Sequence, residues 1–209
     1  MKAVSIRQLS AIIILDNCGK RIAVKYYNDQ FPPKGENKLV YKSSSSKDGI
    51  SAPFENTYNN LRTVEDQKLF ENDITEKARK LGGDSSETEV LVLNKFTILY
   101  LLINDVSIYI VGDESDNEII LHEVMQTVQQ CLDNVTNNQI GKKQLLDKLD
   151  SIYLILDEIA DSGIIMETNP NVIINRLYMH ESDLQEHTPL NQAISSAKEN
   201  IIRSLLSGT

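Results

Sequence analysis

The sequence is poor in the residues that build metal sites, disulfide frameworks and nucleophilic catalytic centres. Its 209 residues include two cysteines, three histidines and no tryptophan. Cys18 and Cys131 lie far apart in the chain and make no disulfide framework. The histidines, His122, His180 and His187, form no spacing with Cys, Asp or Glu that would fix a metal ion. The sequence also lacks a Gly-rich phosphate loop and an exposed-serine elbow. We therefore predict no catalytic residue, no cofactor and no metal site.

Basic residues and long apolar runs are also scarce. Lys and Arg number 21 against 30 Asp and Glu, which gives a net charge of −9. This acidic balance argues against nucleic acid or an anionic lipid surface as the main partner. No apolar run approaches the roughly 20 residues of a membrane span, and the N-terminal stretch lacks the apolar region and cleavage site of a signal peptide. These absences predict a soluble protein of a reducing compartment without a transmembrane segment.

Two small groups of residues remain as candidates for chemistry. Cys18 lies beside Lys20 and Arg21, whose positive charge would lower the pKa of a thiol and make it reactive. No histidine lies near Cys18 in the sequence to act as its base. Asp157 and Asp161 fall on one face of a predicted helix, as an acid pair would, but a solvated polar face explains them equally well. Neither group gives positive support to an enzyme.

What the sequence does contain is a dense set of β-strand signals in its middle. Three apolar runs, Val90–Leu93, Phe96–Ile103 and Val106–Val111, are separated only by Asn94-Lys95 and Asn104-Asp105. Polar pairs this short leave room only for tight turns, so we predict an antiparallel three-strand meander. The middle run is apolar at odd and even positions alike. Because successive strand side chains point to opposite faces, both faces of this sheet must be covered.

The N-terminal part predicts a second pair of strands and a polar insertion. Val4–Leu15 and Lys20–Tyr27 are strand candidates, and the residues between them, Asp16 to Gly19, suit a turn. The two strands are therefore predicted to form a hairpin. Residues 28–62 are rich in Ser, Asn and Pro and carry few apolar side chains. Such a segment cannot bury enough surface to offset its ordering, so we predict an exposed loop there.

Three helices are predicted around these strands. Thr63 and Asp66 form a variant capping box that opens a helix running to Leu81, before Gly82-Gly83. Its apolar face is predicted to be Leu69, Phe70, Ile74, Ala78 and Leu81, and its polar face Glu65, Lys68, Glu71, Asp73, Lys77 and Lys80.

The second and third helices follow the meander. Asp113–Asp116 gives an acidic start to a helix whose apolar positions extend to Val135. After Gly141, residues Lys142–Asp161 predict a third amphipathic helix that packs on the second as a hairpin. Ile164–Asn175 is predicted to run partly extended around Pro170. The order is ββαβββαα, an α+β fold with a mainly antiparallel sheet.

The C-terminal segment predicts an amphipathic helix over Leu190–Leu206. Burial of its four large apolar side chains yields about 1.5–3 kcal/mol each, while fixing the backbone costs about 1–2 kcal/mol per residue. The apolar contribution alone is too small, so the helix needs a docking surface. We predict that it packs on the domain or on a partner; a membrane-lying helix is the alternative, although such helices usually carry a face rich in Lys and Arg.

Several segments together resemble the zeta subunits of the coatomer (COPI) vesicle coat, in the adaptor small-chain, longin-like family. They are LDxxGKRIxxKYY at 15–27, NEI at 117–119, LDExxDxGxIxET at 156–168 and SAKENIxxSLL at 196–206. The related sigma chains of clathrin adaptors share the hairpin and the helix order, but the tail is similar to zeta. The resemblance covers most of the chain except residues 32–62, where a long polar insertion departs from the family.

The resemblance implies a longin-like fold, with five antiparallel strands, one helix on one face and two on the other, plus a C-terminal helical tail. It also implies a structural role without catalysis. The chain would pair with the trunk of the coatomer gamma subunit, alongside other coatomer subunits. The coat would be cytoplasmic and peripheral to Golgi and COPI vesicle membranes, recruited there by an Arf-family GTPase, for Golgi-to-ER retrograde and intra-Golgi transport.

The predicted organisation is a domain at 1–176 with its insertion at 28–62, followed by a tail at 177–209. Tyr26 and Tyr27, predicted to be exposed at the end of the second strand, are candidates for partner contact because aromatics are enriched in interface cores. Plain core packing explains them as well. Ile201 and Leu205 on the tail are the other candidate contacts. Two alternative functions remain: a sigma-type adaptor chain that binds sorting peptides, in a groove lined by Val124 or Leu102, and a longin-fold regulator of a small GTPase.

Overall fold

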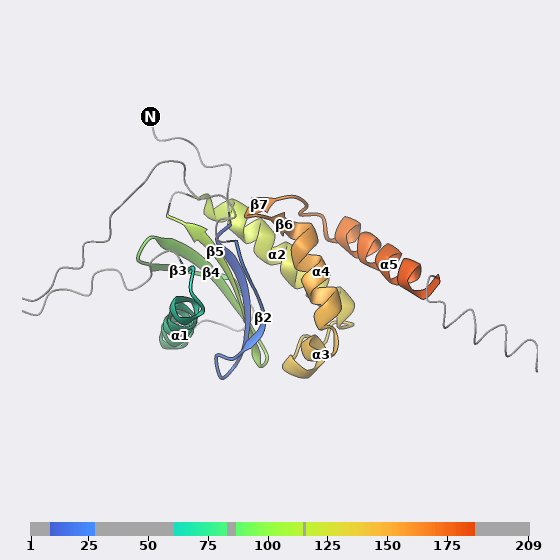
Figure 1. The fold of residues 1–209 in the computed structure, drawn as a ribbon. Helices are drawn as coiled ribbons and strands as arrows, with labels where there is room; N and C mark the ends of the chain where they lie inside the picture. Colours follow the sequence, from blue (N-terminus) through green and yellow to red (C-terminus); the bar gives the residue numbers. More distant parts are fainter. Residues whose placement is uncertain (1–8, 28–60, 83–86, 115, 187–209) are drawn as a thin grey trace, which may run out of the picture.

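The computed structural model describes residues 9–27, 61–82, 87–114 and 116–186 (Figure 1). Most of the predicted insertion and the whole of the predicted tail helix lie outside these residues, as do the tail positions Ile201 and Leu205. The predicted boundary between residues 176 and 177 falls inside the last described helix. The division into a domain and a tail therefore stays a prediction.

Five antiparallel strands form one sheet in the order β2-β1-β5-β4-β3. The predicted hairpin and meander are both confirmed, and the pairing of β1 with β5 joins them. In the meander turns Asn94 and Asn104 have φ of 54° and 53°, a left-handed conformation that asparagine tolerates. The strands are β1 (Ala11–Asp16), β2 (Arg21–Tyr26), β3 (Glu89–Leu93), β4 (Phe96–Ile103) and β5 (Val106–Asp113).

Helix α1 (Val64–Leu81) covers one face of the sheet (Figure 1). As predicted, the Thr63 side chain caps its N-terminus by accepting from the backbone N–H of Asp66 at 3.1 Å. Gly82 ends the helix in the left-handed conformation, with φ of 64°. The buried side chains of α1 pack on those strand residues that point to this face. This cluster includes Phe70, Ile74 and Ala78 from the helix and Ile13, Ile98, Tyr100, Tyr109 and Val111 from the sheet.

The other face is covered by a layer of helices, α2 (Glu118–Val135), α4 (Leu149–Ile159) and α5 (Pro170–Glu186), with the short α3 (Lys142–Asp147) at its end (Figure 1). Apolar rows from these helices pack against strand residues of the opposite parity, such as Ile12, Ile14, Leu99, Ile108 and Ile110. Residues Phe96–Leu101 of β4 and Val106–Gly112 of β5 are buried. The prediction that both faces are covered is therefore confirmed.

The predicted third helix is broken, and part of the following segment was predicted wrongly. Lys148 leaves the helical region at φ −123° and ψ 26°, and its N–H donates to Leu145 O at 3.1 Å, three residues back. The chain then leaves α4 at Ala160 and forms a two-strand ribbon, β6 (Ala160–Asp161) with β7 (Ile164–Ile165). Ser162 and Gly163 turn this ribbon with φ of 50° and 82°.

The predicted extended segment around Pro170 is instead the start of α5. Pro170 is the first residue of that helix, a position where its fixed φ suits the helix and its missing N–H costs nothing. The backbone N–H of Asn171 donates to the Asn169 side chain at 3.0 Å. The acidic start predicted for the second helix is likewise shifted, because Asp113 ends β5 and the N-cap of α2 is Asn117.

Candidate partner interface

Strand β2 is an edge of the sheet, and a β-bulge decides where its side chains point. Ile14 pairs with Ala23 while the next residue, Leu15, pairs with Arg21, so Ile22 is the extra residue. Ile22 and Ala23 consequently both pack in the cluster beneath α2 and α4. If side chains alternated strictly along β2, Arg21 would lie on the same side of the sheet as Ala23, beneath α2 and α4. The bulge directs Arg21 to the α1 side instead, a common effect of such extra residues.

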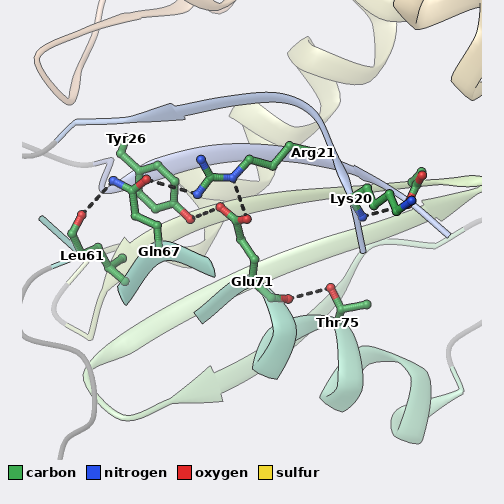
Figure 2. Close-up of polar contacts among 8 residues, drawn as sticks. Lys20, Arg21, Tyr26, Leu61, Gln67, Glu71 and Thr75 are labelled. Atoms are coloured by element: carbon green, nitrogen blue, oxygen red, sulfur yellow. Dashed lines mark hydrogen bonds and ion pairs between the residues drawn. The ribbon is translucent and has the colours of Figure 1, made fainter. Parts of the chain in front are cut away.

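On the α1 side, Arg21 enters a hydrogen-bonded group centred on Glu71 (Figure 2). Arg21 Nε donates to Glu71 Oε2 at 2.8 Å, and the Tyr26 hydroxyl donates to Glu71 Oε1 at 2.7 Å. The Glu71 side chain is only 4% exposed, so it needs both donors. A second Arg21 nitrogen, Nη2, reaches Gln67 Oε1 at 3.2 Å, and Gln67 Nε2 donates to Leu61 O at 3.0 Å. The group therefore ties the edge strand to α1 and to the residue that precedes it.

The electrostatics of this group follow from burial and from the Glu71 carboxylate. The hydrogen bond to Glu71 raises the pKa of Arg21. Burial first, and then the charge of Glu71, raise the pKa of Tyr26 well above its ordinary value. Tyr26 is therefore a neutral donor and Arg21 a fixed cation over the whole physiological range.

The prediction placed Glu71 on the polar face of α1 and Leu69 on its apolar face, and both placements are wrong. Leu69 is 49% exposed, whereas Glu71 is 3% exposed as a residue. With about 100° between successive helical residues, Glu71 lies close to Phe70, Ile74 and Ala78 on the wheel, and Leu69 does not. The helical spacing of Glu71 from Phe70, Ile74 and Ala78 was therefore the sequence signal that could have predicted its burial. No sequence signal marked its partner Arg21, because the bulge is not visible in the residue pattern.

On the opposite side, β2 is tied to the helical layer by Lys25. Lys25 Nζ donates to Ala160 O at 3.1 Å and to Leu156 O at 3.4 Å, and it also pairs with the Asp157 carboxylate. The ammonium lies 5.2 Å from the centre of the Tyr27 ring, within cation–π range. The Tyr27 hydroxyl makes a long hydrogen bond of 3.5 Å to Leu156 O. Both faces of this edge strand are therefore fastened to helices.

The prediction that Tyr26 and Tyr27 are exposed is wrong. Tyr27 is 5% exposed and belongs to the core beneath the helical layer. Tyr26 points to the other face, where it is half-buried against the α1 cluster. Burial, and to a lesser degree the charges of Asp157 and Asp161, raise the pKa of Tyr27. Core packing accounts for Tyr27, and the role of either tyrosine in partner contact stays a prediction.

The turn that leads into β2 is organised by a buried carboxylate. Asp16 is 1% exposed. Its Oδ1 accepts from the backbone N–H groups of Cys18 and Lys20, each at 2.8 Å, and its Oδ2 pairs with Lys142 Nζ of α3 at 2.8 Å. Burial alone would raise the pKa of Asp16, but the bonds from Lys142, Lys20 and Cys18 outweigh it and the pKa is lowered. The carboxylate thus fixes both the turn and the start of α3.

Next to β2, the helices α3 and α4 present accessible apolar and aromatic side chains. Leu146 on α3 is 44% exposed and Tyr153 on α4 is 42% exposed. Tyr153 lies near enough to Arg21 to affect the pKa of the guanidinium. We name Arg21, Tyr26, Leu146 and Tyr153 the β2 surface. Tyrosine and arginine are the residue types enriched in interface cores.

The family model for the clathrin adaptor complex small chain matches residues 45–184. The matched range includes α1, the meander and most of the helical layer. The chain belongs to the clathrin adaptor complex small chain family. Curated members of similar sequence include coatomer subunit zeta-1 of Arabidopsis thaliana, which is 31% identical over 93% of this chain and 94% of its own length. Coatomer subunit zeta-2 of Mus musculus is 30% identical over 97% of this chain and 82% of its own length.

The fold of this small-chain family member also resembles a structure of an adaptor complex. A chain in "Homology model of the full-length AP-3 complex in a stretched open conformation" superimposes with a TM-score of 0.52. The alignment covers 92% of this chain and 98% of that chain, at 17% sequence identity. At that identity the likeness shows the fold alone. The predicted longin-like arrangement is confirmed.

The groove residues named for the sorting-peptide alternative do not face a common surface. Val124 of α2 is fully buried in the helical layer. Leu102 of β4 is half-buried on the other face of the sheet, against the α1 cluster. Val124 is therefore not accessible to a peptide without movement of α2, whereas Leu102 is partly accessible.

The candidate reactive groups of this small chain are separated from one another. Cys18 is exposed in the β1–β2 turn, whereas burial raises the pKa of Cys131 to about 12. Asp157 pairs with Lys25, and its neighbour Glu158 pairs with Arg176 Nη1 at 2.7 Å. Within the described residues, no three His, Cys, Asp or Glu side chains come together as metal ligands. Likewise, no described helix is long and apolar enough to cross a bilayer.

Proposed function

We propose that the chain is a non-catalytic structural subunit of a COPI-type coatomer, paired with the trunk of the gamma subunit. Its place as a small vesicle-coat subunit in transport follows from family membership. The observation that carries the finer proposal is the near full-length similarity to coatomer zeta subunits, over 93% of this chain for one relative and 97% for another. That similarity includes the β1–β2 hairpin, which the family model does not match.

The proposed role follows from the same assignment. The chain acts in Golgi-to-ER retrograde and intra-Golgi transport, in a cytoplasmic coat that an Arf-family GTPase recruits to Golgi membranes. Other coatomer subunits complete the assembly. The chain contributes no catalysis and holds no cofactor, and its function is its interface.

The β2 surface is the proposed site of contact with the gamma trunk, together with Ile201 and Leu205 of the tail. Its aromatic and cationic side chains are held in place from below, because Glu71 fixes both Arg21 and Tyr26. Preorganised contact side chains reduce the entropy lost on binding. Contact through Tyr27 stays a prediction, although its side chain is buried in the free chain.

Co-expression with the gamma trunk tests this proposal directly. The two chains should elute together from size exclusion at moderate salt, and Tyr153→Ala in the β2 surface should weaken the complex by about 10-fold, as expected of an interface aromatic. The matched control is Tyr178→Ala on α5, which is 53% exposed and outside the β2 surface. Two folded chains that elute separately would rule out the pairing. If Tyr153→Ala does not weaken the complex, the contact with the gamma trunk lies outside the β2 surface.

A further inference from the structure

The two edges of the sheet differ in how they are protected. Strand β2 carries the bulge at Ile22 and the charged Lys25, which bonds to Ala160 O. Bulges and charged side chains are the usual means by which an edge strand avoids pairing with a further strand. At the opposite edge, β3 pairs with β4 in a regular register and contains no proline, lysine or bulge. The β3 edge therefore lacks the protection that β2 has.

The backbone groups at the β3 edge belong to Val90 and Val92. The turn between β3 and β4 is two residues long, so Leu93 and Phe96 are a hydrogen-bonded pair. Such pairs alternate along an antiparallel ladder, and the N–H and C=O groups of Val90 and Val92 therefore point away from β4. Among the described residues, these four groups have no hydrogen-bond partner. They form a row of donors and acceptors that suits an added strand.

The side chains of the same two residues are accessible and apolar. Val90 is 52% exposed and Val92 is 63% exposed. Val90 pairs with Leu99, which packs in the cluster beneath the helical layer, so both valines lie on that face of the sheet. Helix α2 contacts β4 and β5 there. The two valines thus make an apolar row directly beside the unpaired backbone groups.

This edge is complementary to itself. When two copies of β3 are placed antiparallel around a two-fold axis at Leu91, Val90 of each copy lies opposite Val92 of the other. Both of these contacts are hydrogen-bonded pairs, and β-branched side chains opposite each other stabilise a sheet. Glu89 then lies opposite Leu93, so no like charges meet within β3. A two-fold contact of this kind closes on itself and needs no third copy.

We propose that β3 pairs antiparallel with β3 of a second copy of this chain, with Val90 opposite Val92, and so joins two five-stranded sheets into one. The contact is short, and it is therefore weak between free molecules. A coat holds many copies side by side, and this high local concentration makes weak contacts between neighbouring units effective. That use in a coat rests on the proposed function, whereas the strand pairing rests on β3 alone.

The first experiment measures self-association of the full chain by sedimentation from micromolar to millimolar concentration. The wild type should shift toward a dimer as its concentration rises. Val92→Lys places a charge on the apolar row, and Val92→Pro removes the outward N–H without touching the β4 ladder. Each dimer contains the Val90–Val92 contact twice, so both variants should raise the dimer Kd about 10-fold or more. The control is Met166→Lys, at a residue that is 64% exposed outside the sheet.

Thermal unfolding of each variant shows whether the chain is still folded, and both tests at Val92 use an exposed position. A wild type that stays monomeric at its highest concentration would overturn the proposal. So would a dimer that neither folded Val92 variant weakens.

The second experiment tests the register by disulfide formation. Residues opposite each other in a hydrogen-bonded pair have Cα atoms about 5.5 Å apart, a distance that a disulfide spans. Cys18 is exposed and is replaced by Ser in all chains, while Cys131 is buried. A mixture of the Val90→Cys and Val92→Cys chains should form linked dimers several-fold faster than either chain alone. Equal rates in the mixture and in the single chains would contradict this pairing.

A third measurement separates this proposal from the pairing with the gamma trunk. Because β3 and the β2 surface lie at opposite edges of the sheet, Val92→Lys should bind the trunk as tightly as the wild type does. Failure of the trunk to bind would leave the sedimentation and disulfide results unaffected. A trunk complex that Val92→Lys disrupts, together with a wild-type chain that does not self-associate, would assign the β3 edge to the trunk and overturn the proposal.

Discussion

On the α1 side of the sheet, a carboxylate and hydroxyl groups are buried among the apolar side chains of the helix itself. Beneath α2, α4 and α5 the core is built from apolar rows, and the buried carboxylate on that side, Asp16, lies at the β1–β2 turn beside α3. Glu71 and Thr75 are buried on α1, and Tyr109 lies under it. The buried polar residues on α2 and α4 are uncharged, Thr127 and Ser151. Glu71 and Thr75 belong to α1, so this helix meets the sheet through hydrogen bonds as well as apolar contacts. Directional bonds therefore position α1, while apolar burial supplies most of the stability on the other face.

The largest expected effect is a truncation within the helical layer. Ile155 of α4 is fully buried, so Ile155→Ala removes apolar contacts and leaves a cavity, at a cost of about 2–5 kcal/mol. The control Ile164→Ala, at a residue that is 41% exposed, should cost under about 1 kcal/mol. Chemical denaturation of both variants measures the difference. Equal losses would mean that the apolar layer does not dominate stability.

Removal of the buried charge on α1 should have the next largest effect. Glu71→Gln keeps the shape of the side chain but weakens its bonds to Arg21 and Tyr26, which should cost about 1–3 kcal/mol. The control is on the same helix: Glu76→Gln breaks a surface pair with Lys80 in which the Glu76 side chain is 66% exposed, and should leave the unfolding midpoint nearly unchanged. Similar unfolding midpoints for the two variants would show that Glu71 does not position α1.

The pH dependence should single out the carboxylate at the β1–β2 turn. A carboxyl group whose pKa is lowered in the fold, as for Asp16, stabilises the protein above its unfolded pKa of about 3.9. That contribution is lost as the pH falls through the lower, folded value. Stability measured by denaturation should therefore decline more steeply below about pH 4 for the wild type than for Asp16→Asn. Asp147→Asn, at an exposed position on α3, should follow the wild type.

The smallest effect is expected where the helical layer ends, at the other edge strand. Val92 of β3 is 63% exposed although it points to the helical face, while its neighbour Leu91 is 6% exposed under α1. Val92→Ala should change stability by less than about 0.5 kcal/mol, and Leu91→Ala should cost about 2–5 kcal/mol. Thermal unfolding of the two variants gives this contrast. A large loss of stability in Val92→Ala would show that the helical layer also covers β3.

The alternation and spacing of apolar residues predicted the meander, the hairpin and the two covered faces. These features depend on short-range rules, and the unbroken apolar run of β4 required burial on both sides. The Pro170 segment was predicted wrongly because a proline also starts helices, and the composition of neighbouring residues did not distinguish the two cases. The bulge at Ile22 and the hydrogen bonds around Glu71 could not be predicted, because each depends on how residues from several elements meet in space.

The bulge has a consequence for how family members are compared. A relative of the same length whose second strand keeps strict alternation would present a basic side chain at the position of Arg21 to the helical layer instead of to α1. Two aligned arginines could then serve unlike surfaces, and two that occupy different alignment columns could serve the same one. Homologous small chains should accordingly be compared by sheet face rather than by position in the hairpin.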